Sequence, residues 1–225
     1  MALQTFFAQI IAKELVASHM LQIRFAKPEG FEYQAGQFLQ LLVPPGATPR
    51  SYSLSSTPTD DYLEFGVKLY EGGLASEYFQ TLTVGDQVEL KGSLGRFINT
   101  QRDPIVGIAT GAGLVPIYGI FHDELMNKKN QAPMHLIFGV RTEADLFWLD
   151  RLEALASANS NFTYIYTLSQ PSENWKKTRG RVSEHLTLLP EARYFICGNP
   201  EMVKDVRAQL LEKAVPVTNI HLEIF

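Results

Sequence analysis

The sequence predicts two consecutive domains, an antiparallel β domain of the barrel or sandwich type and an α/β domain built on a parallel sheet. Two patterns predict this division. Up to about Leu90, short β-rich segments alternate with turn residues, which is typical of antiparallel barrels. Beyond about Asn99, strand-like segments alternate with helical ones, as in a parallel sheet covered by helices. We place the domains at residues 1–99 and 100–225, with the junction within Asn99 to Asp103.

The elements of the first domain follow from local composition. The strand-like segments are rich in β-branched and aromatic residues, and turns such as Pro28-Glu29-Gly30 and Pro44-Pro45-Gly46 separate them. One short helix is expected over Ser76 to Leu82. The expected strands are 6–12, 20–25, 37–43, 51–56, 62–70 and 86–90.

The second domain alternates strand-like and helical segments, and this order favours parallel strands. The expected strands are 104–110, 134–140, 162–168, 194–198 and 220–225. The expected helices are 116–125, 145–156, 182–186 and 201–214.

Composition and charge exclude several classes of protein. The chain has 225 residues, of which 45% are hydrophobic and 20% charged, as is usual for globular proteins. A formal net charge of −4 argues against a non-specific nucleic-acid binder. The apolar segment Leu3 to Ala17 is interrupted by Lys13 and Glu14 and follows no basic residue, so we interpret it as mature protein rather than a signal peptide. No apolar run reaches the ~20 residues that cross a bilayer, and a cytoplasmic protein without membrane insertion is expected.

The cysteine and histidine content limits the possible redox centres. Cys197 is the only cysteine, so the chain can form neither an internal disulfide nor a four-cysteine iron–sulfur cluster. The five histidines show no HExxH pattern, and no metal site is expected.

Two motifs in the first domain could bind phosphate and an aromatic ring. In the strand segment Arg50-Ser51-Tyr52-Ser53, the guanidinium can bind a pyrophosphate and the tyrosine can stack on a flat ring. Gly72-Gly73-Leu74-Ala75-Ser76 precedes the short helix, whose first N–H groups can bind an anion. The alternatives are an ordinary strand with a half-buried tyrosine and a glycine turn with a serine cap.

Three motifs in the second domain lie at the ends of expected strands, where open α/β sheets bind ligands. The glycine-rich segment 109–116 turns from strand to helix and suits a dinucleotide pyrophosphate, although it lacks the third glycine of GxGxxG. Cys197-Gly198-Asn199-Pro200 could lie beside a nicotinamide, or be only a buried strand end. Glu223-Ile224-Phe225 places a carboxylate near a terminal aromatic, which could also be simple packing or a frayed terminus.

Together and in this order, the five motifs resemble those of the ferredoxin–NADP⁺ reductase superfamily over nearly the whole chain. Its members pair a flavin-binding antiparallel barrel with an NAD(P)-binding parallel-sheet domain. The resemblance implies that a hydride passes from NADPH or NADH to bound FAD, and that electrons continue to a separate ferredoxin, flavodoxin or oxygenase component. The alternatives are an NAD(P)H:free-flavin reductase, a non-catalytic electron-relay subunit, and a flavin- or nucleotide-sensing module.

In the first domain, the resemblance assigns Arg50 to the flavin pyrophosphate, Tyr52 to the isoalloxazine face and Ser53 to the vicinity of flavin N5. Residues 90–97 resemble the segment that closes the flavin domain, with Ser93 in place of proline. The other implied flavin contacts are Ser51, Val67, Lys68, Leu69, Gly73, Leu74, Ala75, Ser76 and Phe225.

Across the two domains, the resemblance implies a catalytic set of Ser53 in the first and Cys197 and Glu223 in the second. In this set Ser53 and Glu223 hold and transfer protons, and Cys197 packs near nicotinamide C4. Phe225 would cover the flavin face that the nicotinamide must reach. The implied NAD(P) contacts are Thr110, Gly111, Ala112, Gly113, Arg141, Cys197, Gly198, Asn199 and Pro200.

The choice between cofactors stays partly open. Tyr52 favours a bound FAD over a flavin that only visits as a substrate, and FMN is an alternative. A basic run follows Leu168-Ser169-Gln170 and could bind the 2′-phosphate of NADPH, dock an acidic partner, or form a solvated loop. The run consists of Lys176, Lys177, Arg179 and Arg181.

Overall fold

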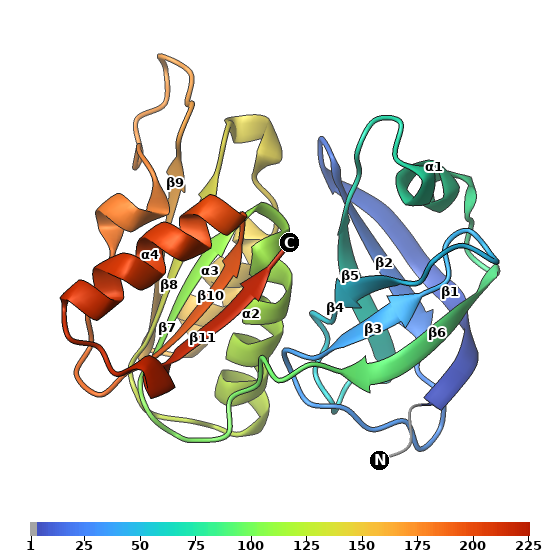
Figure 1. Ribbon diagram of the computed structural model, residues 1–225, viewed down its shortest axis with the longest axis horizontal. Coiled ribbons are helices and arrows are strands. Elements are labelled where there is room, and N and C mark those ends of the chain that lie inside the picture. Colours follow the sequence, from blue (N-terminus) through green and yellow to red (C-terminus); the bar gives the residue numbers. More distant parts are fainter. Residues whose placement is uncertain (1–3) are drawn as a thin grey trace.

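The computed structural model describes residues 4–225 and contains a β domain followed by an α/β domain (Figure 1). The first domain is a six-stranded antiparallel sheet in the order β4-β3-β6-β1-β2-β5. An isolated antiparallel bridge between Leu54 and Phe65 joins the two outer strands, so the sheet closes into the predicted barrel. The strands are β1 (Gln4–Ala17), β2 (Met20–Ala26), β3 (Phe38–Leu41), β4 (Arg50–Ser53), β5 (Tyr62–Lys68) and β6 (Gln87–Leu94).

The barrel core is formed by apolar side chains that point inward from alternate positions of the strands. Leu39 and Leu41 of β3 are fully buried, and Phe25 and Phe65 meet edge to face across β2 and β5. The short helix α1 (Leu74–Thr81) packs Phe79 onto this core. The barrel is therefore a packed body, and ligand contacts must lie at its rim.

The strand β1 is longer than predicted, because it pairs with two neighbouring strands one after the other. Its first half pairs with β6, from Gln4 to Gln9, and its second half pairs with β2, from Ile10 to Ala17. A register shift between Ile10 and Ala12 marks the second pairing. A bulge of this kind bends a strand and lets the sheet curl.

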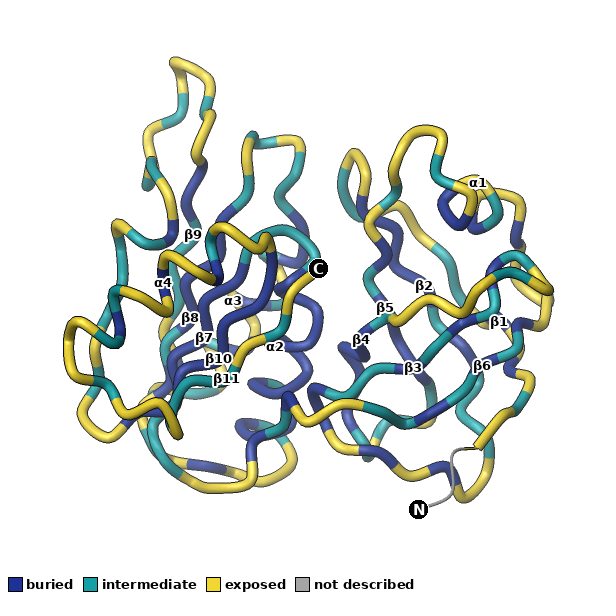
Figure 2. The backbone as a smooth tube through the Cα atoms, in the orientation of Figure 1, coloured by how far each residue is buried: buried dark blue, intermediate teal, exposed yellow. Residues whose placement is uncertain are grey.

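The second domain is a five-stranded parallel sheet in the order β11-β10-β7-β8-β9. Its central strands β10, β7 and β8 are largely buried between helical layers, which is visible as their dark blue colour in Figure 2, whereas the edge strands β11 and β9 are partly exposed. This arrangement confirms the predicted α/β class. The strands are β7 (Ile105–Thr110), β8 (Met134–Val140), β9 (Phe162–Leu168), β10 (Arg193–Gly198) and β11 (Ile220–Ile224).

Helices cover both faces of this sheet. The helix α2 (Leu114–His122), which continues into a π-helical turn (Asp123–Asn127), packs with α3 (Leu149–Ala158) in one apolar cluster. The helix α4 (Pro200–Glu212) packs on the other face with the 3-10 helix Val182–His185. None of the helices within residues 4–225 is long and apolar enough to span a membrane.

Two predicted helices differ from the observed ones. The helix expected from residue 145 begins only at Leu149, because Trp148 adopts a left-handed backbone with φ of 56°. Residues Glu143–Asp145 form a separate 3-10 turn instead, held by the Thr142 and Asp145 side chains. The segment expected as a helix over 182–186 forms only a short 3-10 helix.

The junction predicted within Asn99 to Asp103 lies in the segment 95–104 that connects β6 to β7. The exact division at residues 99 and 100 stays a prediction. The C-terminus, at the end of β11, lies on the side of the α/β domain that faces the barrel (Figure 1).

Candidate active site between the two domains

The ends of β4 and β11 meet across the domain boundary. Ser53, the last residue of β4, is buried, and its Oγ donates a hydrogen bond of 3.3 Å to Oε1 of Glu223 on β11. The two residues come from different domains and are separated by 170 positions in the sequence. The structure therefore brings together two of the three residues expected to be catalytic.

Burial changes the acidity of the Glu223 carboxyl group. Desolvation raises its pKa from 4.5 to about 7, although the hydrogen bond from Ser53 opposes the shift. Oε2 of Glu223 is buried and has no hydrogen-bond partner among residues 4–225. A carboxyl group with a pKa near neutrality can both donate and accept a proton at the pH of the cell.

The third expected catalytic residue, Cys197, lies beside Glu223 in the neighbouring strand. The parallel register of β10 and β11 pairs Cys197 with Glu223 directly. Cys197 is fully buried, and burial together with the nearby carboxylate raises the pKa of its thiol well above the ordinary value. The thiol is therefore neutral, and it can pack against a ligand or position it without adding charge.

The glycine-rich turn of the second domain packs tightly against the Cys197-Gly198 strand end. Gly111–Gly113 form a 3-10 turn that leads directly into α2. A β-carbon on Gly113 would lie 2.0 Å from the carbonyl oxygen of Cys197, so only glycine fits. Gly198 has φ of +144° and lies against Thr110, whose Oγ1 accepts the N–H of Asn199 at 3.2 Å. The two motifs expected to bind NAD(P) are therefore one connected surface.

The remaining residues of that second motif cap α4. Oδ1 of Asn199 accepts the N–H of Glu201 at 2.9 Å, and Pro200 occupies the first helical position. Asparagine and proline are favoured at these two positions of a helix. Asn199 and Pro200 thus have a structural role besides the expected contact with NAD(P).

The expected flavin strand β4 presents side chains at the rim of the barrel. Arg50 and Ser51 are exposed, whereas Tyr52 is half-buried. The Tyr52 ring meets Phe79 of α1 edge to face, with 5.3 Å between ring centroids, and burial raises the pKa of its hydroxyl to about 12. The tyrosine is therefore neutral and held in place by one edge.

The second phosphate motif begins α1. Gly73 is the N-cap and supplies no side chain, so the first-turn N–H groups of Leu74, Ala75 and Ser76 are not capped by it. Ser76 is buried, and its Oγ accepts the backbone N–H of Tyr70 at 2.9 Å. The hydroxyl thus shapes the loop before the helix, and its own hydrogen is left to donate.

The other expected ligand contacts lie at different depths. In β5 the side chain of Val67 is buried in the barrel and Lys68 is exposed; Leu69, which follows the strand, is half-buried. Arg141 is exposed directly after β8. Phe225 is 49% exposed, and its N–H donates to the carbonyl of Gly198 at 3.1 Å.

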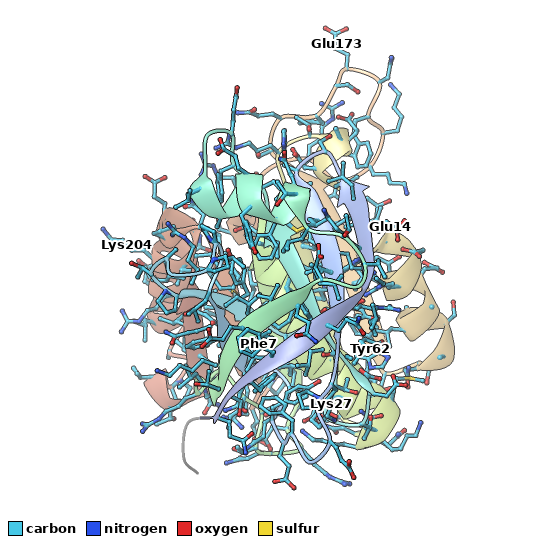
Figure 3. All side chains as sticks on the ribbon, turned by 90° about the vertical axis from the view of Figure 1, so that its right-hand side faces the viewer. Phe7, Glu14, Lys27, Tyr62, Glu173 and Lys204 are labelled. Carbon is cyan, nitrogen blue, oxygen red and sulfur yellow. The ribbon has the colours of Figure 1, made fainter. Side chains whose placement is uncertain are left out.

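The basic loop projects beyond the body of the protein, with Glu173 at its tip (Figure 3). Arg179 donates from Nη2 to the carbonyls of Ser172, Glu173 and Trp175, and Lys177 contacts the hydroxyl of Tyr166. Two of the four basic side chains therefore hold the loop together. Lys176 and Arg181 are exposed.

One buried polar cluster at the domain boundary was missed by the sequence reasoning. Glu64 of β5 is 2% exposed and forms salt bridges with Arg24 of β2 and Arg151 of α3. A charged residue within the apolar strand segment YLEFGV was the available signal, because a buried carboxylate needs a partner.

Comparisons with known proteins agree with this architecture. Residues 8–98 match the family model of the oxidoreductase FAD-binding domain, and residues 108–208 match that of the oxidoreductase NAD-binding domain. Ferredoxin–NADP reductase B of Sorangium cellulosum is 30% identical, in a match covering 98% of this chain and 97% of that protein.

Other relatives belong to oxygenase systems. The toluate 1,2-dioxygenase electron transfer component of Pseudomonas putida is 30% identical, over 91% of this chain and 62% of that protein. The anthranilate 1,2-dioxygenase electron transfer component of Acinetobacter baylyi is 33% identical, over 86% of this chain and 58% of that protein. The chain thus spans less than two thirds of the length of these two relatives.

Solved structures share the arrangement of both domains. The cytochrome P450 reductase of Amycolatopsis superposes with a TM-score of 0.90 and 28% identity, covering 99% of this chain and 70% of that one. A ferredoxin–NADP⁺ reductase of Neisseria gonorrhoeae, solved with bound FAD and NADP, gives a TM-score of 0.84 and 26% identity, covering 98% of each chain.

The fold and the two family models define an oxidoreductase with an FAD-binding barrel and an NAD-binding α/β domain. The chain belongs to the ferredoxin–NADP⁺ reductase superfamily, as the sequence motifs predicted.

The residues at the boundary fit an FAD molecule. The buried Oε2 of Glu223 lacks a partner within residues 4–225, and the first turn of α1 offers N–H groups that no N-cap side chain occupies. Arg50 is exposed on the same rim, beside the half-buried ring of Tyr52. A pyrophosphate needs donors and positive charge, and a flavin ring needs a flat apolar face.

Proposed function

We propose that the protein catalyses hydride transfer from NADPH or NADH to FAD held in the barrel, and that electrons then pass to a separate acceptor. The contact between Ser53 and Glu223 is the observation that carries this proposal. It places the end of the expected flavin strand against the end of the strand pair that holds Cys197. Hydride transfer requires two rings at this boundary to approach within ~3 to 3.5 Å.

The chain's own residues hold and orient the two ligands. Arg50 and the first turn of α1 bind the flavin pyrophosphate, and Tyr52 supports the ring. The turn Gly111–Gly113, together with Thr110, binds the NAD(P)H pyrophosphate at the start of α2. FAD, when bound, supplies the position that accepts the hydride, while the protein supplies binding and orientation. The further ligand contacts in this proposal are Ser51, Val67, Lys68, Leu69, Ala112, Arg141, Gly198, Asn199 and Pro200.

Ser53 and Glu223 hold and transfer the proton that accompanies hydride transfer. Glu223 has a pKa of about 7, so it holds a proton in part of the population at neutral pH. Ser53 bridges the carboxyl group and the flavin edge, and the neutral Cys197 packs beside the nicotinamide. Phe225 would cover the flavin face that the nicotinamide must reach, and the coenzyme would have to displace it.

The acceptor is a separate redox protein, either a ferredoxin, a flavodoxin or the oxygenase component of a larger system. The names of the relatives support this choice, since they include a ferredoxin–NADP reductase and two dioxygenase electron transfer components. Free flavin is the second candidate. A cytoplasmic location stays a prediction from the sequence.

Purified protein in an anaerobic cuvette tests the proposal. We expect a yellow protein, or a colourless one that FAD reconstitutes, whose visible absorbance bleaches on addition of NADPH or NADH. A protein that FAD cannot reconstitute, or that neither coenzyme bleaches, would contradict it. The rates of reoxidation by ferredoxin, flavodoxin and free FMN, compared at equal concentration, then distinguish the acceptors. The preferred coenzyme is the one that reduces the flavin faster.

A further inference from the structure

Glu64 is the centre of a polar cluster that connects three elements and includes none of the proposed reacting groups. Its carboxylate is buried at 2% exposure. Oε2 accepts from Nε of Arg24 on β2 at 2.7 Å, within the barrel. Oε1 accepts from Oγ of Ser55 at 2.8 Å, just two residues beyond Ser53. The carboxylate thus anchors the segment that follows the expected flavin strand.

Arg151 of α3 reaches the same carboxylate from the other domain. Nη1 donates to Oε1 of Glu64 at 2.7 Å and Nη2 donates to Oε2 at 3.1 Å, so the pair is bidentate. Nη2 also donates to Oε1 of Gln22 at 2.8 Å, and that oxygen accepts from Nε1 of Trp148 at the same distance. A planar, two-pronged pair fixes an angle as well as a distance.

Close packing between the barrel and α2 lies beside this cluster, and it depends on the same relative orientation of the two domains. A β-carbon on Gly66, two residues after Glu64, would lie 2.5 Å from Cγ2 of Val115 on α2. A β-carbon on Gly119 would lie 3.0 Å from the carbonyl oxygen of Leu54. The two surfaces are therefore in close contact, and sliding of one on the other would break both this contact and the bidentate pair.

We propose that Arg151 is a positioning residue, whose bidentate pair with Glu64 sets the relative orientation of the two domains at which Ser53 meets Glu223. The part of this inference that concerns catalysis rests on the proposed function. Arg151 itself touches neither of the expected reacting groups. It acts through Glu64, Ser55 and the short segment that leads back to Ser53.

Arg24 offers a matched control, because it binds the same carboxylate from within the barrel. Arg151→Ala and Arg24→Ala each remove one arginine from Glu64, but only the first removes a bond between domains. We expect Arg151→Ala to slow flavin reduction by NAD(P)H in stopped flow by about tenfold or more, with unchanged reduction by dithionite. Arg24→Ala should keep that rate within about twofold.

A second readout requires neither flavin nor turnover. In the apoprotein, small-angle X-ray scattering should give a larger radius of gyration for Arg151→Ala than for Arg24→Ala and the parent protein. Arg151→Lys keeps the charge but cannot form two parallel hydrogen bonds. Its radius of gyration should therefore lie between those of the parent protein and Arg151→Ala. If Arg151→Ala does not fold, Arg151→Lys is compared with Arg24→Lys in the same two measurements.

Equal effects of the Arg151 and Arg24 substitutions on rate and scattering would overturn the proposal, as would parent-like values for Arg151→Ala in both. A parent protein that no coenzyme reduces would instead contradict the proposed function. The scattering comparison of the apoproteins would still decide whether Arg151 orients the domains.

Discussion

Oγ of Ser53 donates to Oε1 of Glu223 across the domain boundary, at a distance of 3.3 Å. The serine ends a strand of the barrel, and the glutamate lies on the outer strand of the parallel sheet. The hydrogen bond exists only when both domains are folded and correctly oriented. Ser53 and Glu223 therefore report on the site and on the domain arrangement together.

Glu223→Gln should remove a pH dependence of stability. The pKa of Glu223 in the folded protein is about 7, above the ordinary 4.5. The contribution of Glu223 to the free energy of unfolding is therefore fully present below pH 4.5 and is lost as pH rises through 7. The shift corresponds to roughly 3 kcal/mol at most. Urea unfolding of the apoprotein at pH 5 and pH 8 measures it. Identical pH dependence in both proteins would contradict the raised pKa.

Ser53→Ala should slow flavin reduction and move its pH dependence. The hydrogen bond from Ser53 lowers the pKa of Glu223, so its loss should shift the midpoint of the pH–rate profile to higher pH. Removing a donor at a reacting centre costs on the order of tenfold or more in rate. Stopped-flow reduction between pH 5.5 and 9 tests both effects, with the exposed Ser160→Ala as control. Unchanged rates would remove Ser53 from the catalytic set.

Tyr52→Ala should weaken FAD binding by about tenfold, because the ring is the flat face expected to support the flavin. Tyr52→Phe keeps the ring and its edge contact with Phe79, so it should bind FAD nearly as well as the parent protein. Titration of the apoprotein with FAD, followed by fluorescence quenching, gives the dissociation constants. Equal affinities for the alanine and phenylalanine variants would exclude stacking on Tyr52.

Gly113→Ala should destabilise the protein and weaken coenzyme binding, since the added β-carbon meets the backbone of Cys197 at 2.0 Å. Overpacking against backbone costs about 1 to 3 kcal/mol. Gly30→Ala is the comparison, because Gly30 has φ of +72° and open space around it. It should cost about 1 kcal/mol and leave the Michaelis constant for NAD(P)H unchanged. If Gly113→Ala matched Gly30→Ala in both stability and Michaelis constant, the turn Gly111–Gly113 would be able to move to accept the β-carbon.

Much of the fold was predictable because burial produces a clear pattern along the chain. The strands 134–140 and 162–168 have the predicted bounds, since both segments are rich in the apolar, aromatic and β-branched residues that favour strands. The start of α3 was not predictable from composition, because the left-handed backbone of Trp148 depends on its tertiary contacts. The indole N–H of Trp148 donates a hydrogen bond to Gln22 in the other domain.

The sequence predicted the candidate site as a set of motifs but not as a geometry. Motif order indicated that Ser53, Cys197 and Glu223 belong to one family of sites, yet no local pattern encodes a contact over 170 positions. The pairing of Glu64 with Arg151 was missed for the same reason. Glu64 needed a cation, and the sequence did not show which arginine would supply it.

The helix α2 has a consequence for the energetics of ligand binding. It starts at the turn Gly111–Gly113, where the coenzyme is expected, and Gly119 lies against the carbonyl of Leu54, the residue after Ser53. One continuous helix thus lies against both expected binding sites. Any displacement of α2 by one ligand changes the affinity for the other, and linkage requires that the two effects be equal. The factor by which NAD(P)H alters the dissociation constant of FAD is therefore the factor by which FAD alters that of NAD(P)H.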